Sequence, residues 1–137
     1  MTTRGASAAS TSGAARREAK PAPLAYEMVQ GALVRWSEEK PDGPHPPTCV
    51  LVHGILGSRR NLQSFAKKLA EKFPSWQFLL VDLRNHGESN TFEAKPEAPH
   101  TVQNAARDVL SVLNHLKIYP YTYSVVVIYK TNHSSSR

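Results

Sequence analysis

The chain has a single cysteine and no long apolar run, and these absences set the first limits on its class. With Cys49 alone among 137 residues, no disulfide can form within the chain. No apolar stretch approaches the roughly 18 residues that a membrane-spanning helix needs. His53 has no partner at the ligand spacings of a zinc motif, so we expect no metal site and no cofactor.

Acidic residues are also few, and the chain is basic. It contains 17 Lys and Arg against 11 Asp and Glu, which gives a formal net charge of +6. The basic residues are spread along the chain, and no aromatic residues interleave with them as platforms for base stacking. We therefore expect no nucleic-acid partner.

Residues 1–23 form an extension that is poor in apolar and acidic residues. The first 20 residues are rich in Ala, Ser and Thr, carry Arg4, Arg16 and Arg17, and include only Glu18 as an acid. This composition is typical of a mitochondrial or chloroplast transit peptide. The alternative is a disordered extension of a cytoplasmic protein, since segments of low hydrophobicity stay disordered whatever their role.

Strand patterns occur at both ends of the remaining chain and between them. Residues 24–29 and 32–36 flank a turn at Gln30-Gly31, which predicts an N-terminal antiparallel hairpin. Continuous apolar runs predict buried strands at residues 49–52, 77–83 and 121–129. Cys49 lies in the first of these runs, where we expect an inert buried thiol; a reactive thiol is the alternative.

Two amphipathic helices separate these strands. A helix over residues 61–73 is predicted to start at a Ser58 or Asn61 cap, to stop before Pro74 and to bury one stripe, made of Leu62, Phe65, Ala66, Leu69, Ala70 and Phe73. Residues 102–116 predict a second helix, capped by Thr101, with Ala105, Ala106, Val109, Leu110, Val112, Leu113 and Leu116 inward. The alternation of strands and helices predicts an α/β fold with a mostly parallel sheet and flanking helices.

Two glycine-containing turns follow the buried strands. Residues 49–58 read CVLVHGILGS and residues 82–89 read DLRNHGES. Both turns lie at carboxyl ends of predicted parallel strands, which is where α/β sheets bind ligands.

Together these motifs resemble the N-terminal half of an α/β-hydrolase, the superfamily of serine esterases, lipases and related acyl hydrolases. The likeness runs over residues 24–120, is greatest to esterase-like abhydrolase-domain proteins, and extends to plant members through LAYEMVQGALVRWS, HGILGSRRN and FLLVDLRNHGES. It implies the N-terminal part of a serine ester or acyl hydrolase fold. In such enzymes the first turn, here His53, Gly54, Ile55, Leu56 and Gly57, supplies a main-chain oxyanion donor. By position the donor is Ile55, with Leu56 as the next candidate.

The second turn is expected to form a wall of the site rather than its catalytic group. Its residues Asp82, His86 and Ser89 have the chemistry of a catalytic triad, but triads are assembled from separate elements. We expect Arg84 to tie the turn down through carbonyls or an acid, Ser89 to cap a local turn, and Gly87 to complete the wall.

No Gly-x-Ser-x-Gly nucleophile elbow is present. The likeness continues through LKIYPY and then ends, so we divide the chain into an extension at 1–23, a partial hydrolase domain at 24–121 and a divergent end at 122–137. Ser134 follows a strand, but Asn132 and Ser136 stand where an elbow has glycines, and we reject Ser134 as a nucleophile.

We therefore expect a truncated, inactive member of a family whose substrates are small acyl esters. The alternative is a non-catalytic interaction module. In that reading, the exposed edge strand at 121–129 mediates self-association or pairing with a full-length relative.

Overall fold

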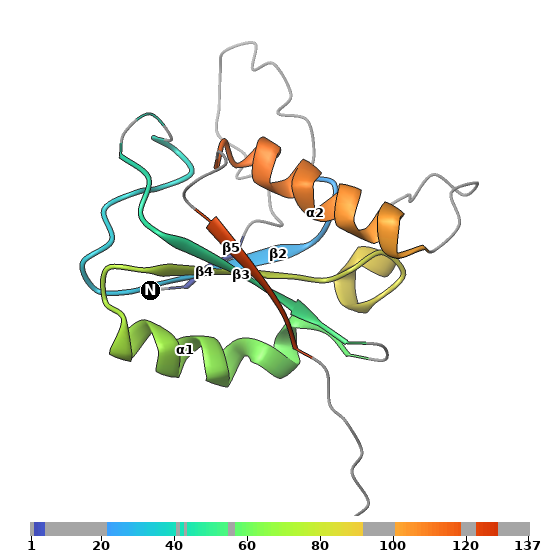
Figure 1. Ribbon diagram of the computed structural model, residues 1–137, viewed down its shortest axis with the longest axis horizontal. Coiled ribbons are helices and arrows are strands. Elements are labelled where there is room, and N and C mark those ends of the chain that lie inside the picture. Colours follow the sequence, from blue (N-terminus) through green and yellow to red (C-terminus); the bar gives the residue numbers. More distant parts are fainter. Residues whose placement is uncertain are drawn as a thin grey trace, which may run out of the picture.

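The computed structural model describes residues 2–4, 22–40, 42, 44–54, 57–91, 101–118 and 123–128. Within them lies one sheet with the strand order β1-β2-β4-β3-β5 (Figure 1). Strands β3, β4 and β5 are parallel, and β2 runs antiparallel to both β1 and β4. The strands are β1 (Thr2–Arg4), β2 (Tyr26–Gln30), β3 (Thr48–His53), β4 (Gln77–Val81) and β5 (Tyr123–Ile128).

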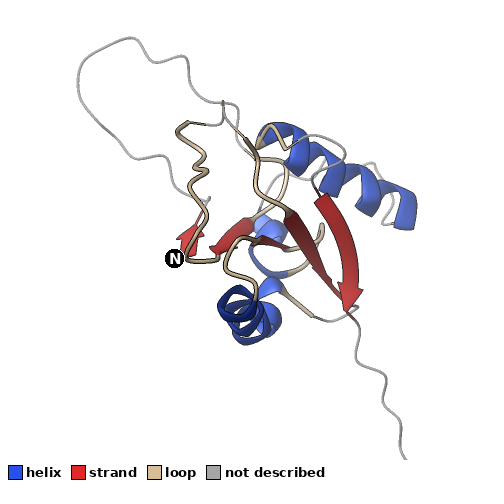
Figure 2. Cartoon of the chain, turned by 60° about the vertical axis from the view of Figure 1, so that its left-hand side comes forward, coloured by secondary structure: helices blue, strands red, loops and turns tan. Residues whose placement is uncertain are grey.

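Helices cover both faces of the sheet, as the α/β prediction requires. On one face lie the 3-10 turn η1 (Arg59–Leu62) and α1 (Gln63–Lys72); on the other lies α2 (Val102–His115) (Figure 2). A second 3-10 turn, η2 (Gly87–Thr91), follows β4. Two apolar clusters result, one between the sheet and α2 and one between the sheet and α1. Among the helices of the described residues, none is long and apolar enough to cross a bilayer.

The predicted helix ends are confirmed. Ser58 caps η1 in a box with Asn61, and Phe73 ends α1 directly before Pro74. The Thr101 hydroxyl accepts a hydrogen bond from the Asn104 N–H at 3.1 Å and so caps α2. Capping of this kind satisfies N–H groups that have no partner within the helix.

The predicted N-terminal hairpin is wrong. Residues 24–29 supply β2, but residues 32–36 form no strand. Instead, β2 pairs with β4 and β1, and Gly31 and Leu33 donate to the carbonyls of Trp76 and Pro74 at 2.8 and 2.9 Å. A strand β1 was not predicted, because three residues of ordinary composition carry no periodic signal.

The buried helix stripes are narrower than predicted. Phe65 and Phe73 of the first stripe are 46% and 49% exposed, and Leu110 of α2 is 48% exposed. Ala106 is exposed as well. The periodicity correctly predicted which face of each helix points inward. The residues at the margins of each stripe are exposed because no other element among the described residues packs against them.

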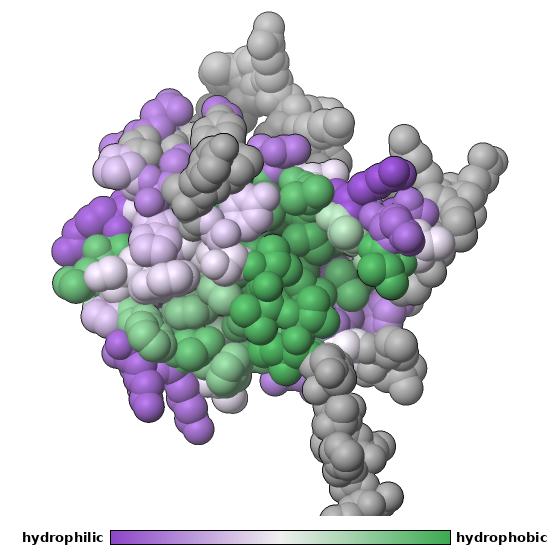
Figure 3. Space-filling view, in the orientation of Figure 1, coloured by the Kyte–Doolittle hydropathy of each residue, from purple (hydrophilic) through white to green (hydrophobic). Residues whose placement is uncertain are grey.

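Strand β5 lies at the edge of the sheet and is largely uncovered, as predicted. Val125, Val126 and Val127 are 49%, 43% and 59% exposed. Figure 3 shows the resulting apolar surface over β5, with hydrophilic side chains only at its margins. An exposed apolar edge of this kind is a template for pairing with another chain.

Candidate oxyanion turn and site wall

The two glycine turns lie together at the carboxyl edge of the parallel strands. Strand β3 ends at His53 and β4 ends at Val81, and β5 reaches the same edge because Ile128 is the register partner of His53. The carboxyl end of β5 therefore lies beside the start of the first turn. This is the place that the resemblance assigns to a nucleophile.

The first turn is closed by its two glycines. The Gly57 N–H donates to the Gly54 carbonyl at 3.0 Å. A Cβ on Gly57 would lie 3.1 Å from that oxygen and 3.3 Å from the His53 Cβ, so the turn has little room for a side chain. Ile55 and Leu56, the predicted oxyanion donors, lie outside the described residues, and so does Ser134.

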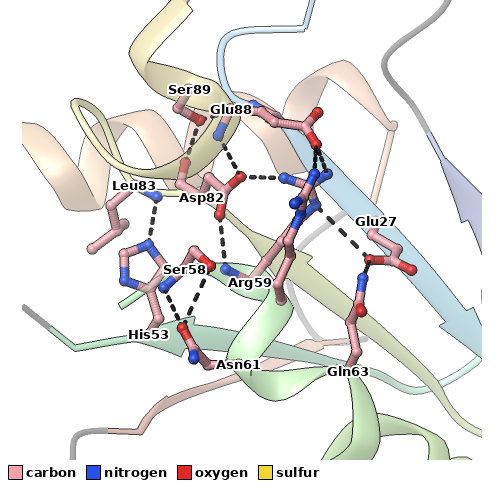
Figure 4. A network of polar contacts seen from close by, with 12 residues as sticks. Glu27, His53, Ser58, Arg59, Asn61, Gln63, Asp82, Leu83, Glu88 and Ser89 are labelled. Atoms are coloured by element: carbon pink, nitrogen blue, oxygen red, sulfur yellow. Dashed lines mark hydrogen bonds and ion pairs between the residues drawn. The ribbon is translucent and has the colours of Figure 1, made fainter. Parts of the chain in front are cut away.

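His53 joins the first turn to the second. Its buried ring contacts the Gly54 carbonyl through Nδ1 at 2.8 Å and accepts the Leu83 N–H through Nε2 at 3.0 Å (Figure 4). These two contacts require a neutral ring with its proton on Nδ1, because a protonated Nε2 cannot accept. His53 therefore positions the two turns relative to each other.

A buried ion pair between Arg59 and Asp82 links the same two segments. The Asp82 carboxylate accepts from the Arg59 guanidinium, from the Arg59 main-chain N–H at 2.7 Å and from the Glu88 N–H at 3.0 Å (Figure 4). Both side chains are almost fully buried. Asp82 thus binds the N-terminus of η1, where a negative charge is favourable, and also holds the loop that follows β4.

Two more carboxylates form ion pairs with Arg59. Glu88 Oε1 lies 3.0 Å from one Arg59 nitrogen, and Glu27 Oε2 lies 3.9 Å from another. Burial by itself lowers the pKa of Arg59, but its contacts with Glu88 and Asp82 outweigh this and raise the pKa above its usual value. Hydrogen bonds from Arg59 and Arg60 lower the pKa of Glu88. The guanidinium therefore stays charged inside the fold.

Asp82, His86 and Ser89 do not form a catalytic relay in this geometry. The Ser89 hydroxyl donates to the Asp82 main-chain carbonyl at 2.6 Å and accepts the Ala25 N–H at 3.0 Å. His86 contacts the Arg84 carbonyl through Nδ1 at 2.9 Å, and its ring centroid is 5.1 Å from that of His53. The serine is engaged with the backbone, as a residue that shapes a loop would be.

Arg84 ties the second turn to α2 through an acid. Its guanidinium donates twice to the Asp108 carboxylate, at 2.6 and 2.8 Å, and this hydrogen bonding raises the Arg84 pKa. Cys49 lies half-buried on β3, where burial raises the pKa of its thiol and so disfavours the reactive thiolate.

Arg59 and Glu27 are parts of this site that were not predicted from the sequence. Arg59 is one of the basic residues that are spread along the chain, yet the structure leaves it 4% exposed. The available signal was the acid inside an apolar strand, Glu27 in LAYEMV, because a buried carboxylate needs a partner. The partner's identity could not be read, since 32 positions separate the two residues.

Gly87 is expected to tolerate no side chain. Its φ is +49°, and a Cβ there would lie 2.5 Å from the Asp82 Cγ. Gly87→Ala should therefore displace the buried carboxylate and lower the free energy of unfolding by about 2–4 kcal/mol. Asn85→Gly is the matched control. Asn85 also has a positive φ, 62°, and its substitution removes a side chain instead of adding one. In urea unfolding this control should change stability by less than about 1 kcal/mol; equal stability of the two variants would contradict the account.

Comparison with known proteins finds relatives that carry hydrolase names. An sn-1-specific diacylglycerol lipase ABHD11 of Mus musculus is 29% identical over 111 residues, which are 80% of this chain and 30% of the relative. The Xenopus tropicalis protein of the same name is 38% identical over 99 residues, covering 69% of this chain and 24% of the relative. An abhydrolase domain-containing protein of Schizosaccharomyces pombe is 36% identical over 70 residues, covering 51% of this chain and 22% of the relative.

No protein-family model matches the chain. The chain spans less than a third of the length of these curated relatives. The α/β sheet with helices on both faces agrees with the kind of protein that the relatives' names describe. Sequence similarity and architecture together relate this chain to the α/β-hydrolase superfamily.

Proposed function

We propose that this chain provides the oxyanion turn and one wall of the acyl site of a serine ester or acyl hydrolase, corresponding to an N-terminal part of such an enzyme. The observation that carries the proposal is the joint anchoring of the two turns at the carboxyl edge. His53 and the Arg59–Asp82 pair fix the turn after β3 against the loop after β4. An oxyanion hole acts by being fixed in advance, so rigid anchoring is the property such a turn needs.

We propose the substrate class from the names of the relatives, at the level of the bond that is cleaved. Their names include a diacylglycerol lipase, which acts on an acyl ester. We assign a small acyl ester to the complete site. The 137 residues contain no Gly-x-Ser-x-Gly, so a polypeptide of this sequence alone is proposed to lack hydrolytic turnover.

A chimera tests the proposal. In the Xenopus tropicalis relative, the matched segment is replaced by residues 24–118 of this chain, and hydrolysis of a p-nitrophenyl acyl ester is measured. We expect turnover within about tenfold of the parent enzyme, because the grafted turn carries its own anchors. A folded chimera with no turnover above the uncatalysed rate would contradict the proposal.

A second candidate function is non-catalytic pairing with another chain through β5. The observation that favours it is the exposure of three consecutive valines on the edge strand of a sheet. Unpaired N–H and C=O groups along such an edge bind an added strand through main-chain hydrogen bonds.

A further inference from the structure

On one face of the sheet, the described residues cover β2, β4 and β3 but leave β5 partly exposed, since Leu51 of β3 is buried whereas Val126 of β5 is 43% exposed. Helix α1 packs against β2 and β4, and its Gln63 side chain donates to Glu27 of β2 at 2.7 Å. Packed helices lie about 8–10 Å apart and strands about 4.8 Å apart, so one helix covers about two strands. In Figure 2, β5 continues beyond the part of the sheet that α1 underlies. Among the described residues, no helix other than η1 and α1 lies on this face, which leaves room beside α1 for a second helix over β5.

The side chains on this uncovered area are apolar. Leu51 belongs to the cluster on the α1 side, and its register partner is Val126, so Val126 points to the same side and is 43% exposed there. We call this area the open face. It consists of Cys49, Val126 and Ile128 on the strands, and of Phe65, Leu69 and Phe73 along the neighbouring flank of α1.

The open face has the character of a helix-packing site. Phe65 and Leu69 of α1 are spaced four apart on one flank of the helix, and Phe73 follows at its C-cap. Leu69 packs in the same cluster as Cys49 and Ile128. Helix α1 stands about one helix diameter, about 10 Å, above the sheet, so the open face is a step rather than a flat surface. A flat bilayer would touch the top of α1 without reaching Val126. A helix lying beside α1 would contact both.

A second copy of this chain fits the open face poorly. If the outer side of its α1 entered the open face, the exposed residues Lys67, Lys68 and Lys72 would be buried there and their charges would lie against valine. Pairing of β5 with β5 across a two-fold axis would extend the sheet but bring no helix, so the open face would stay uncovered in both copies.

We infer that β5 and the open face together bind a strand and its connected amphipathic helix from a second, hydrolase-type polypeptide. The relatives supply a source of such a segment, because 70% or more of their length lies outside the region that this chain matches. Lys68 and Lys72 are exposed at helical spacing from Phe65 and Leu69, so the bound helix should carry acidic residues on the flank that faces α1. This inference rests on the pairing function proposed above and adds the helix to it.

Co-expression tests the inference with a defined probe. The tagged full chain is produced together with the C-terminal portion of the Xenopus tropicalis relative that lies beyond the matched segment. The amount of probe recovered per mole of chain is measured, and the complex is sized by sedimentation. We expect a one-to-one complex. Val126→Lys and the exposed helix variant Phe65→Asp should each lower recovery at least tenfold. Val127→Lys lies on the same strand but points to the α2 face through its register with Val52, and should change recovery less than twofold.

The other results each overturn the inference. If Val126→Lys and Val127→Lys lowered the recovery of the probe equally, binding would occur through strand pairing alone. The proposed pairing function would then stand, but the open face would have no part in it. Self-assembly of the chain that excludes the probe would assign the face to a second copy. Recruitment to phosphatidylserine vesicles without probe binding would assign it to a membrane, and no binding at all would leave it without this partner. Because recovery is measured without turnover, an inactive complex would count against the hydrolase proposal only.

Discussion

Replacing Asp82 by alanine is expected to lower the free energy of unfolding by about 3–5 kcal/mol. The carboxylate is fully buried and accepts from the Arg59 side chain and from two main-chain N–H groups. Its removal leaves a buried guanidinium next to only Glu27 and the half-exposed Glu88, and leaves two amides without their acceptor. A domain of this size has about 5–15 kcal/mol of stability in total, so much of the population would unfold on mild heating.

Two further variants separate the buried charge from the rest of the effect. Asp108→Ala breaks the more exposed Arg84–Asp108 pair and should cost about 1 kcal/mol or less. Adding Arg59→Met to Asp82→Ala removes the uncompensated charge and should recover part of the loss. Urea unfolding followed by circular dichroism measures all of them. If Asp82→Ala were no more costly than Asp108→Ala, the ion pair would not be the anchor of the two turns.

Within the chimera, Ile55→Pro is expected to lower kcat by about 10²–10³-fold, equivalent to about 2.7–4 kcal/mol of transition-state stabilisation. Proline has no N–H, so the substitution deletes the proposed main-chain donor; its ring also fixes φ and restricts Gly54, so the effect is read only in a variant that folds. Since the donor acts on the developing oxyanion, kcat and kcat/KM should fall together.

Ile55→Ala is the matched control, because it shortens the side chain and keeps the N–H. Its kcat should stay within about threefold of the chimera. Leu56→Pro distinguishes the two candidate donors, since a loss there without a loss at Ile55 would move the role by one residue. If a folded chimera kept its kcat with proline at either position, the turn would not supply the oxyanion donor.

Local pattern was sufficient to predict the helices and the parallel strands. The spacing of Leu62, Ala66 and Ala70 reports a helix face directly, and the run at residues 77–81 reports a buried strand because all five residues are in fact buried. The hairpin prediction failed for a physical reason. Each residue of β2 pairs with a β4 residue that lies 47 to 55 positions further along the chain, which a local pattern does not report. The turn signal at Gln30-Gly31 therefore predicted a hairpin that the fold does not contain.

The site was predictable as two turns but not as one connected unit. Strand order places His53 and Asp82 at the same edge, which follows from the motifs and the parallel sheet. The connection through Arg59 does not follow, because a basic residue at a helix start is ordinarily solvated. Only the three-dimensional approach of β2, η1 and the loop after β4 makes it the common partner of Glu27, Asp82 and Glu88. The exposure of Phe65 likewise depends on what lies beside α1 over β5, and the periodicity of α1 carries no information about that.

Labelling with a fluorophosphonate probe tests the central claim most directly. The purified, folded 137-residue polypeptide is incubated with the probe, and covalent adducts are counted by intact mass spectrometry, with the parent hydrolase of the chimera as the positive control. We predict no serine adduct on this chain and stoichiometric labelling of the control, because the proposed oxyanion turn is not accompanied by a Gly-x-Ser-x-Gly nucleophile in these 137 residues. Stoichiometric modification of a serine, at Ser89, Ser134 or elsewhere, that is lost on heat denaturation would contradict the account.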